Sequence, residues 1–404
     1  MGYMPKANTI LLVQAVFPPE PVVSAIIGYD LAKELADKSA LTVVVVCPKP
    51  TRPFGKKLNE FNFSNVKFKR VVLKSFTFPR SEFIGRMVES ICFGIATRRY
   101  IAENHAKLKY IYMNTWPLFA QYITIRASVK YHIPCWAHIQ DVYPESMLSR
   151  LKSIGNLIRP FFLRLDSFYM NKCDGIIAIS EKMSDYLIKT RKLNPRKVQI
   201  IRNWQDESLF AVDSLKDKTK ETCFTFMFVG SISPAANLPF FIQTFIETEL
   251  NNAKLVIAGD GSDKKLCEMI VNGKGVSNVF FQTINPCEVS LVQSKADVLI
   301  LPLKSGVGLT ASPSKLSAYM LSAKPIVASV DPFSDVDFII KKSDCGWVCK
   351  SDNKVALMQC LRAVRNLSAG QLIQYGERGR KYALLNMSKK ENLRRLSNVF
   401  IKSK

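Results

Sequence analysis

The chain has 404 residues, of which 48% are hydrophobic, 22% charged and 10% aromatic. This composition can fill the cores of two or three domains and excludes disorder as the main state. The ten cysteines lack a C-x-x-C pair, so they indicate reduced thiols in a cytosolic compartment rather than a zinc site or a disulfide framework. The apolar run Leu41 to Cys47 is far shorter than the roughly 20 residues that span a bilayer, and Met1 to Pro19 has no signal-peptide cleavage pattern. We therefore expect neither a secreted nor an integral membrane protein.

The charge balance is strongly basic, with 57 Lys and Arg against 33 Asp and Glu and a net charge of +24. Residues 1–200 hold 30 basic and 14 acidic side chains, so the N-terminal half is the more basic one. Such a field attracts anions and anionic surfaces. Charge alone selects no partner, so anionic lipid, phosphorylated small molecules and nucleic acid stay open here, although no nucleic-acid motif accompanies it.

Short β-branched runs alternate with helical patterns from the start of the chain, which predicts a parallel sheet built from βαβ units. A helix is expected at Ser24 to Ala36. The strands expected in the first series are Thr9 to Val16, Leu41 to Cys47, Val66 to Val72, Tyr110 to Thr115, Pro134 to Gln140, Gly175 to Ser180 and Val198 to Asn203. Their continuous apolar character is typical of strands buried on both faces.

The polar segment Gln205 to Glu221 is interpreted as the crossing to a second domain of the same kind. The strands expected there are Phe224 to Gly230, Lys254 to Gly259, Val279 to Thr283, Val298 to Pro302, Pro325 to Ser329 and Gly346 to Cys349. A closing helix is expected at Lys389 to Ile401. We divide the chain into residues 1–205, residues 206–385 and a C-terminal helix in residues 386–404 that returns to the first domain. Two such α/β domains in tandem would enclose a ligand cleft at the carboxyl ends of their strands.

Two segments of the first half place polar residues after a predicted strand. Residues 17–25 read FPPEPVVSA, a rigid loop with Pro19 and Glu20 before a helix that Ser24 can cap. The loop either faces the cleft or is a stiff turn before the cap. In AHIQDVYPES, His138 and Asp141 are expected at the carboxyl end of a strand, where Asp141 either takes part in acid–base chemistry or caps a helix.

Three loops of the second half could bind phosphate. Gly230 and Ser231 follow one strand, with free backbone N–H groups expected in their loop, and Gly259, Asp260 and Gly261 follow the next. The densest signal is LPLKSGVGLTASPSKLSAYM at residues 301–320, a strand, a glycine-rich loop and a helix whose first turn carries Ser314 and Lys315. A helix N-terminus and an adjacent lysine would stabilise a diphosphate, although a capped helix without a ligand has the same pattern.

Standard phosphate, nucleophile and zinc motifs are absent from the sequence, which has only three histidines. Read in order, however, eight segments resemble the GT-B glycosyltransferases of family 4, particularly bacterial enzymes of capsule, O-antigen and colanic-acid synthesis. The segments are FPPEPVVSA, HIQDVYPES, IIAISE, IIRNW, FVGSISPAAN, LVIAGDG, ADVLILPL and SPSKLSAYMLSAKPIVAS. They span about Thr9 to about Lys350.

The resemblance implies two Rossmann-like domains, with the acceptor on the N-terminal one and a nucleotide-diphosphate sugar on the C-terminal one. It implies transfer with retention of configuration, without a metal or other cofactor, from a UDP-sugar or less readily a GDP-sugar to a lipid-linked saccharide. The donor-binding residues would be Gly230, Ser231, Gly259, Asp260, Gly261, Thr310, Ser312, Ser314 and Lys315. The acceptor-side residues would be Pro19, Glu20, Ser24, His138 and Asn203.

Lys315 would stabilise the charge that develops on the departing diphosphate, which can itself accept the acceptor proton. Asp141 is the first candidate for orienting the acceptor hydroxyl and Glu20 the second. The sequence departs from the family where many members carry two glutamates eight positions apart, because Thr310 and Ala318 occupy those positions. Ser231 and Ala236 likewise replace a frequent Arg and Lys.

Two basic and apolar stretches could lie on anionic lipid. The first contains Lys74, Arg80, Arg86, Arg98, Arg99, Lys107 and Lys109 among Phe76, Phe78, Phe83, Ile84, Phe93 and Ile95, and the second Arg150, Lys152, Arg159, Phe161, Phe162 and Arg164. The alternative is that they pack on the sheet with solvated basic faces.

We therefore expect a glycosyltransferase of surface-polysaccharide synthesis, peripheral on the cytoplasmic face of the inner membrane and without a nucleic-acid partner. The alternatives are a catalytically silent nucleotide-sugar or lipid-binding partner of an assembly complex, and a GT-B sugar-nucleotide epimerase.

Overall fold

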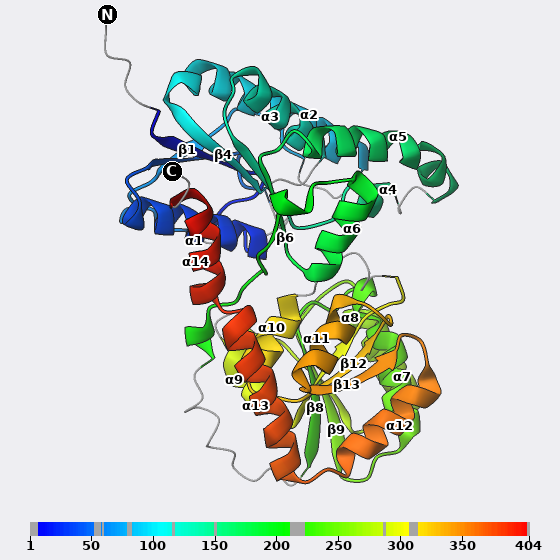
Figure 1. The fold of residues 1–404 in the computed structure, drawn as a ribbon. Coiled ribbons are helices and arrows are strands. Elements are labelled where there is room, and N and C mark those ends of the chain that lie inside the picture. Colours follow the sequence, from blue (N-terminus) through cyan, green and yellow to red (C-terminus); the bar gives the residue numbers. More distant parts are fainter. Residues whose placement is uncertain are drawn as a thin grey trace, which may run out of the picture. The chain divides into compact units, whose positions relative to one another are not determined.

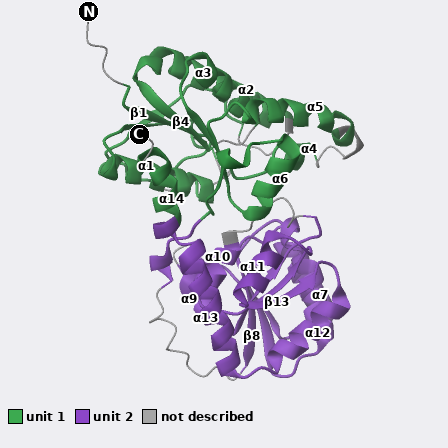
Figure 2. Cartoon of the chain, viewed as in Figure 1, with its two compact units in different colours: residues 1–203, 392–404 green, residues 204–391 purple. Residues whose placement is uncertain are grey.

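The computed structural model of the protein describes residues 7–51, 58, 60–78, 83–114, 118–148, 152–210, 223–285, 288–306 and 314–401, apart from the side chains of residues 83, 152–154 and 314 (Figure 1). The chain divides into two compact units (Figure 2). Unit 1 holds residues 1–203 and 392–404, and unit 2 holds residues 204–391. The polypeptide therefore enters unit 2 once and returns to unit 1 through its last helix.

Unit 1 is built on a seven-stranded sheet in the order β3-β2-β1-β4-β5-β6-β7. Every neighbouring pair is parallel. The strands are β1 Thr9–Gln14, β2 Thr42–Cys47, β3 Lys69–Val72, β4 Leu108–Asn114, β5 Cys135–Ile139, β6 Gly175–Ala178 and β7 Val198–Ile200. The strand order reverses between β1 and β4, which is the switch point where ligands of such folds bind.

Helices cover both faces of this sheet. They are α1 Val23–Lys38, α2 Phe83–Asn104, α3 Leu118–Lys130, α4 Glu145–Leu148, α5 Lys152–Met170, α6 Glu181–Arg191 and the returning α14 Lys389–Ile401. Leu11 and Val13 of β1 share one core cluster with Phe93 of α2. Phe400 of α14 instead contacts the rings of Tyr110 and Tyr112. Side chains of one strand alternate between two faces, so this sheet is buried on both.

Unit 2 repeats the design with a six-stranded parallel sheet in the order β10-β9-β8-β11-β12-β13. The strands are β8 Phe224–Val229, β9 Ala253–Ala258, β10 Val279–Gln282, β11 Val298–Pro302, β12 Ile326–Val330 and β13 Gly346–Lys350. In chain order this is the 3-2-1-4-5-6 arrangement of dinucleotide-binding folds, with its switch point between β8 and β11.

The helices of unit 2 also form two layers. They are α7 Leu238–Thr248, α8 Lys264–Lys274, α9 Val289–Ser294, α10 Ser314–Leu321, α11 Asp335–Ser343, α12 Lys354–Arg365 and α13 Ala369–Asn386. Phe226 and Phe228 of β8 join the cluster that contains residues of α7, α8 and α12. Met227 and Val229 join the cluster that contains residues of α9, α10, α11 and α13.

The predicted fold class is confirmed, and each of the thirteen expected strands corresponds to a strand of the structure. The helix expected at Lys389 to Ile401 has those bounds. The prediction that Ser24 caps the first helix is wrong. That helix begins at Val23, and its N-cap residue Val22 makes no side-chain capping bond. Ser24 lies inside the first turn, where its carbonyl accepts a hydrogen bond from the Asn114 side chain.

Candidate functional site

Two glycine turns meet at the carboxyl edge of the unit 2 sheet. Gly230 follows β8 with a φ of +141°, and Gly259 follows β9 with a φ of +148°, a backbone conformation that other residues rarely adopt. A Cβ on Gly259 would lie 2.0 Å from the carbonyl oxygen of Gly230. Glycine is therefore required at Gly259 for the two turns to approach backbone to backbone.

Backbone hydrogen bonds also join the loops that carry these two glycines. Ile232 donates its N–H to the Asp260 carbonyl at 2.9 Å, and Gly230 donates its N–H to the Ala258 carbonyl at 2.9 Å. These two backbone donors are therefore used inside the fold and are not available to a phosphate. The Asp260 carboxylate is exposed and accepts the N–H of Gly261 in its own loop at 2.9 Å.

Helix α10 is fixed against the end of β8 by one buried side chain. The Tyr319 hydroxyl donates to the Val229 carbonyl at 3.0 Å and accepts from the Val229 N–H at 2.9 Å. Val229 is the residue directly before Gly230. The tyrosine thus holds the first turns of α10 beside the Gly230 turn.

Lys315 is the cation that this arrangement brings to the turn. Its Nζ lies 3.5 Å from the Ser231 carbonyl oxygen and 4.8 Å from the centroid of the Phe228 ring. Burial lowers the pKa of the lysine to about 8. Among the residues that the structure describes, no carboxylate pairs with it. An anionic group would restore full charge to the lysine and gain from it.

A pocket of about 320 Å³ opens beside Lys315, entirely within unit 2. Most of its walls are apolar, and its polar lining comes from a few side chains. It is lined by Gln205, Leu209, Phe210, Val229, Gly230, Ile284, Val289, Ser290, Gln293, Lys315 and Ala318. A mainly apolar cavity with a few convergent polar groups is typical of small-molecule sites.

The loop after β11 is anchored before it reaches α10. The Asp331 carboxylate, at the end of β12, accepts the Gly306 N–H at 2.8 Å and the Ser305 hydroxyl at 3.1 Å. The predicted donor residues Thr310 and Ser312 lie outside the described residues. Ser314 is the first residue of α10, and its side chain is not described.

In unit 1, the candidate Glu20 is buried in the loop after β1. Its carboxylate accepts the Thr51 N–H at 3.1 Å and the Phe17 N–H at 3.4 Å. These bonds tie the β1 loop to the segment after β2. Pro19 is half-buried in the same loop. The carboxylate of Glu20 therefore stabilises the loop, which limits it as a group for substrate.

His138 lies inside β5 and is only 1% exposed. Its Nδ1 lies 2.7 Å from the Tyr112 hydroxyl, and its Nε2 lies 3.1 Å from the side-chain nitrogen of Gln140. Burial lowers the pKa of His138 to about 3, so the ring is neutral at physiological pH. We expected this side chain to point into a cleft at the sheet edge. Instead it belongs to the packed interior, because side chains within a central strand face the covering helices.

Asp141 is half-buried two residues beyond the end of β5. The segment that follows it is held by Arg191 of α6, a fully buried arginine. The guanidinium donates to Glu145 at 2.5 and 2.6 Å, to Asp166 at 2.8 Å and to the Tyr143 carbonyl at 2.7 Å. This network joins α4, α5 and α6 and fixes the chain that carries Asp141.

Asn203 follows β7, and its buried Oδ1 has no hydrogen-bond partner in the described part of the chain. It lies after the last strand of the sheet, whereas Glu20 follows the central β1. Because β4, β5 and β6 lie between β1 and β7, these two predicted acceptor-side residues do not form one cluster.

No group of three His, Cys, Asp or Glu side chains suited to a metal ion occurs among the described residues. In the same part of the chain, no helix combines the length and the apolar character needed to cross a membrane.

Two family models match the chain, each on one unit. The model described as Glycosyltransferase Family 4 matches residues 27–209, and the model described as Glycosyl transferases group 1 matches residues 223–366. The chain therefore carries a glycosyltransferase family 4 domain in its first half and a glycosyl transferases group 1 domain in its second. The predicted resemblance is thereby confirmed.

Curated relatives are distant. A probable glycosyltransferase of Pseudomonas aeruginosa, WbjE, is 21% identical over 58% of this chain and 60% of its own length. The O-antigen chain mannosyltransferase RfbU of Salmonella typhimurium is 21% identical over 61% of this chain and 71% of its own length. The match to the Pseudomonas protein thus spans less than two thirds of that relative.

Solved structures share the fold along nearly the whole chain. HepE of Anabaena, crystallised with UDP, is 14% identical with a TM-score of 0.70 and covers 97% of this chain and 99% of its own. Sucrose-phosphate synthase of Thermosynechococcus elongatus is 15% identical with a TM-score of 0.74 and covers 98% and 99%. At this identity the likeness shows the GT-B fold alone.

Sequence reasoning missed the residues that complete the pocket and hold the loops. Gln293, Tyr319 and Arg191 sit within helices, where no motif distinguishes them from ordinary packing residues. A weak signal existed for Gln293 and Arg191, because a polar residue on the buried face of a helix needs a partner.

Proposed function

We propose that this protein is a retaining glycosyltransferase that moves a sugar from a nucleotide-diphosphate sugar, with UDP favoured, to a lipid-linked saccharide in bacterial surface-polysaccharide synthesis. The observation that carries the proposal is the Lys315 ammonium beside the Gly230 turn, at the switch point of unit 2 and next to a pocket. A cation without a carboxylate partner among the described residues suits a diphosphate.

The names of related proteins support the donor and the pathway. HepE, which shares the fold, has been crystallised with UDP and with UDP-glucose. The Salmonella relative is named for O-antigen synthesis. These names belong to those proteins, and for this chain they favour a UDP-sugar and a surface polysaccharide.

In the proposed reaction the bond between the anomeric carbon and the diphosphate oxygen breaks as the acceptor oxygen attacks from the same face. The leaving diphosphate oxygen takes the proton of the acceptor hydroxyl, so no separate base is needed. Lys315 stabilises the negative charge that develops on the diphosphate. Because the lysine supplies this positive charge, we propose that the reaction needs no bound metal, and we expect EDTA to leave the rate unchanged.

Asp141 is proposed to orient the acceptor hydroxyl, since it follows a central strand of unit 1 on a segment that Arg191 fixes. Glu20 is the weaker candidate because two backbone N–H groups already use its carboxylate. Asp141→Asn should lower kcat with little effect on donor binding, and Glu20→Gln should mainly lower the melting temperature.

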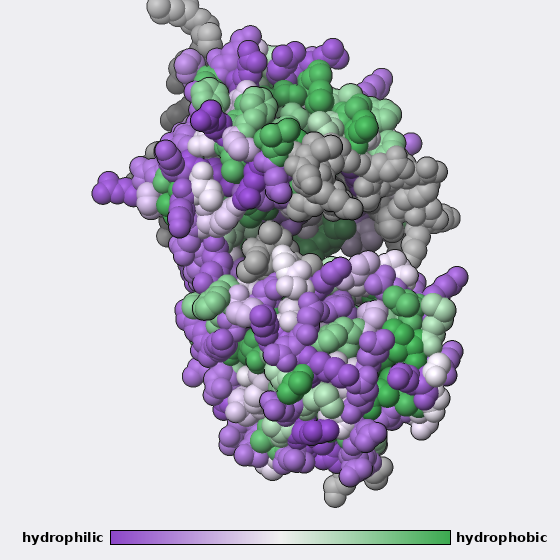
Figure 3. All heavy atoms as spheres, turned by 90° about the vertical axis from the view of Figure 1, so that its right-hand side faces the viewer, coloured by the Kyte–Doolittle hydropathy of each residue, from purple (hydrophilic) through white to green (hydrophobic). Residues whose placement is uncertain are grey.

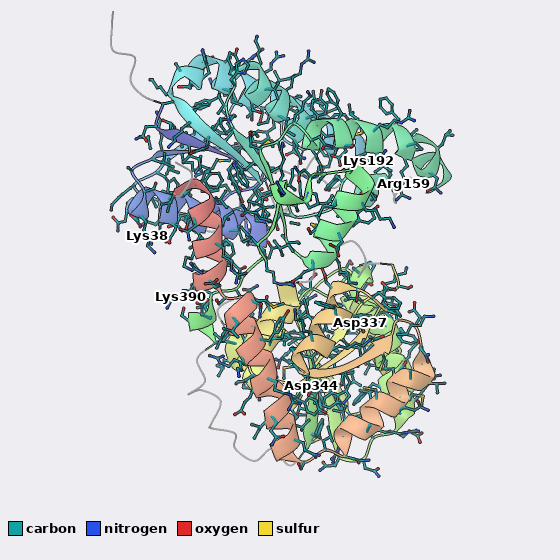
Figure 4. All side chains as sticks on the ribbon, viewed as in Figure 1. Lys38, Arg159, Lys192, Asp337, Asp344 and Lys390 are labelled. Carbon is teal, nitrogen blue, oxygen red and sulfur yellow. The ribbon has the colours of Figure 1, made fainter. Side chains whose placement is uncertain are left out.

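A surface on α5 supports contact with the cytoplasmic face of the membrane. Leu157 and Phe161 are 81% and 66% exposed, Phe168 is 57% exposed, and Arg164 is exposed. Their spacing of four, three and four residues places them on one face of the helix, which we call the α5 stripe. Arg159, labelled on α5 in Figure 4, adds a second exposed basic side chain. A helix face of apolar and basic residues suits anionic lipid.

The predicted basic and apolar stretch between Lys74 and Lys109 exposes fewer of its apolar side chains than we expected. Phe93 is buried in the core, whereas Ile84 is 74% exposed and Val88 42% exposed on α2. Arg80 and Arg150 lie outside the described residues, and the side chains of Phe83 and Lys152 are not described. In the space-filling view, hydrophobic residues gather in patches among hydrophilic ones on the part that holds unit 1 (Figure 3).

The second candidate function is a silent nucleotide-sugar binding partner, favoured by Ala318 in the pocket wall where many family members carry a glutamate. A thermal-shift panel of UDP, GDP, ADP, dTDP and their sugars tests whether the protein binds a nucleotide, which both candidate functions require. A ligand at 100 times its Kd stabilises the folded protein by about 2.7 kcal/mol. We expect the largest shift with UDP or a UDP-sugar. Binding followed by transfer to a lipid-linked acceptor supports the enzyme, and binding without transfer favours the silent partner. If no nucleotide binds, the proposal fails.

Flotation with anionic liposomes tests the membrane contact. We expect salt-sensitive binding that the double variant Leu157→Ser/Phe161→Ser weakens. A matched control is Ile373→Ser/Leu385→Ser, two exposed apolar residues of α13 in unit 2. Equal binding by both variants would contradict the role of the α5 stripe.

A further inference from the structure

One polar side chain in the pocket has no structural partner for half of its amide. Gln293 of α9 lines the pocket and is only 1% exposed. Its amide oxygen accepts a hydrogen bond from the Ser322 hydroxyl at 2.5 Å. Among the described residues no acceptor binds its amide nitrogen. Because Gln293 lines the pocket, a ligand oxygen or a water there can accept a hydrogen bond from this nitrogen.

The short distance to Ser322 fixes the orientation of the amide. A separation of 2.5 Å falls within the range of O–H···O bonds and below that of N–H···O bonds. The Ser322 hydroxyl also lies 3.1 Å from the Ala318 carbonyl oxygen, and its single proton is assigned to the nearer Gln293 oxygen. The nitrogen of Gln293 is then the atom left for the pocket.

The pocket has a charged end and an amide end. Lys315, Ala318 and Ser322 are spaced by three and four residues on α10 and the turn that continues it, so they lie on one face. At 1.5 Å per residue, Ser322 lies about 10 Å along the helix from Lys315. Gln293 thus marks the end remote from the Gly230 turn, and Ala318 leaves the space between them open.

The walls at the amide end suit a flat apolar group. Phe210, Ile284 and Val289 contribute aromatic and aliphatic surface to the pocket. A pocket of about 320 Å³ is at the small end of the range for ligand sites, so it accepts part of a nucleotide-diphosphate sugar. With the diphosphate at Lys315, we assign this end to the nucleoside, because a flat nucleobase needs fewer polar partners from these walls than the hydroxyl-rich donor sugar.

We propose that Gln293 is a specificity-determining residue that donates its amide N–H₂ to an oxygen of the donor nucleoside, with Ser322 holding the amide in place. The inference rests on the proposed function and deepens it, since it assigns the nucleoside contact to a neutral amide on α9.

The test compares binding of UDP, uridine and inorganic pyrophosphate to the full chain by calorimetry, with uridine measured in competition where its binding is weak. In Gln293→Leu we expect the affinity for UDP and for uridine to fall about tenfold, the effect of one lost hydrogen bond. The affinity for pyrophosphate should be unchanged. Lys315→Ala should show the opposite pattern, with pyrophosphate binding lost and uridine binding kept.

Two further variants guard against a folding defect. Gln293→Met has about the length of glutamine but no N–H₂ group, and the Ser322 hydroxyl keeps the Ala318 carbonyl as an acceptor at 3.1 Å. UDP should therefore again bind weakly while the melting temperature without ligand stays close to wild type. Gln199→Leu, the same change at an exposed position of β7, should leave UDP binding as it is.

Wild-type affinity for UDP and uridine in both Gln293 variants would overturn the inference and leave the proposed function standing. A wild-type protein that binds none of the nucleotides would overturn both.

Discussion

The two units share one sheet topology but use the carboxyl edges of their sheets differently. In unit 2 the edge carries Gly230, Lys315 and a pocket, and its lysine has no carboxylate partner among the described residues. In unit 1 the corresponding polar groups serve the scaffold, with Glu20 on backbone N–H groups and His138 inside the sheet. The most elaborate buried ionic network, around Arg191, is also in unit 1.

This difference teaches what each edge can bind. A diphosphate is the same in every donor, so unit 2 can preorganise a cation and a glycine turn for it. In unit 1 the carboxylate of Glu20 instead stabilises its own loop. Polar residues after a strand therefore indicate a site in one unit and a scaffold in the other.

The largest effect on stability should come from the unit 1 network. Arg191→Met leaves Glu145 and Asp166 as buried carboxylates without their cation, which should cost about 3–5 kcal/mol of unfolding free energy. Urea unfolding of the full chain measures it. The control Arg196→Met, at an exposed position, should change little. A loss below about 1 kcal/mol would show that the network is not the support we infer.

The largest effect on activity should come from unit 2. Lys315→Ala should abolish transfer, with a loss of at least about 2.7–4 kcal/mol in transition-state stabilisation, while the fold stays intact. Initial rates and thermal unfolding measure the two effects. Lys304→Ala removes an exposed lysine from the preceding loop and serves as control. Near-normal turnover in Lys315→Ala would remove the phosphate assignment and with it the contrast between the units.

Gly230→Ala should affect both stability and binding. The new alanine would need a φ of +141°, and its Cβ would lie 2.2 Å from Cε of Lys315. We expect this strain to destabilise the protein by about 1–3 kcal/mol and to weaken nucleotide binding. Gly273→Ala is the matched control, because a Cβ there meets nothing within 4 Å in helix α8. That variant should be neutral or slightly stabilising. Equal melting temperatures for the two variants would contradict the steric argument.

The smallest effect is a pH dependence of donor binding. Lys315 has a pKa lowered to about 8 by burial, so it is charged below that pH and loses its proton above it. Bound diphosphate favours the charged form, and affinity should fall by up to about tenfold per pH unit above pH 8. Titration with UDP-glucose between pH 7 and pH 9 measures this, and Lys315→Arg should flatten the profile. A flat wild-type profile would show that the lysine does not face the phosphates.

The sequence was sufficient for the fold because its apolar runs are long and separated by clear helical patterns. A continuous apolar run such as TVVVVC in β2 predicts a buried parallel strand without any knowledge of its neighbours in the fold. The glycine turns and Lys315 were also predictable, since backbone conformation and a charge beside a helix start are local properties. Ser24 failed as a cap because the N-cap of α1 is Val22, two residues earlier, which local propensity does not resolve.

Tertiary structure alone decided which polar residues are available. Nothing local distinguishes His138 in β5 from a residue at the strand end, but burial against Tyr112 and Gln140 removes it from chemistry. Gln293 and Arg191 acquire their roles from partners 25 to 48 residues away in the chain. The sequence by itself determined the two sheets and the glycine turns after β8 and β9. Only packing decided the rest, because hydrogen bonding and desolvation of a side chain depend on neighbours that the fold brings together.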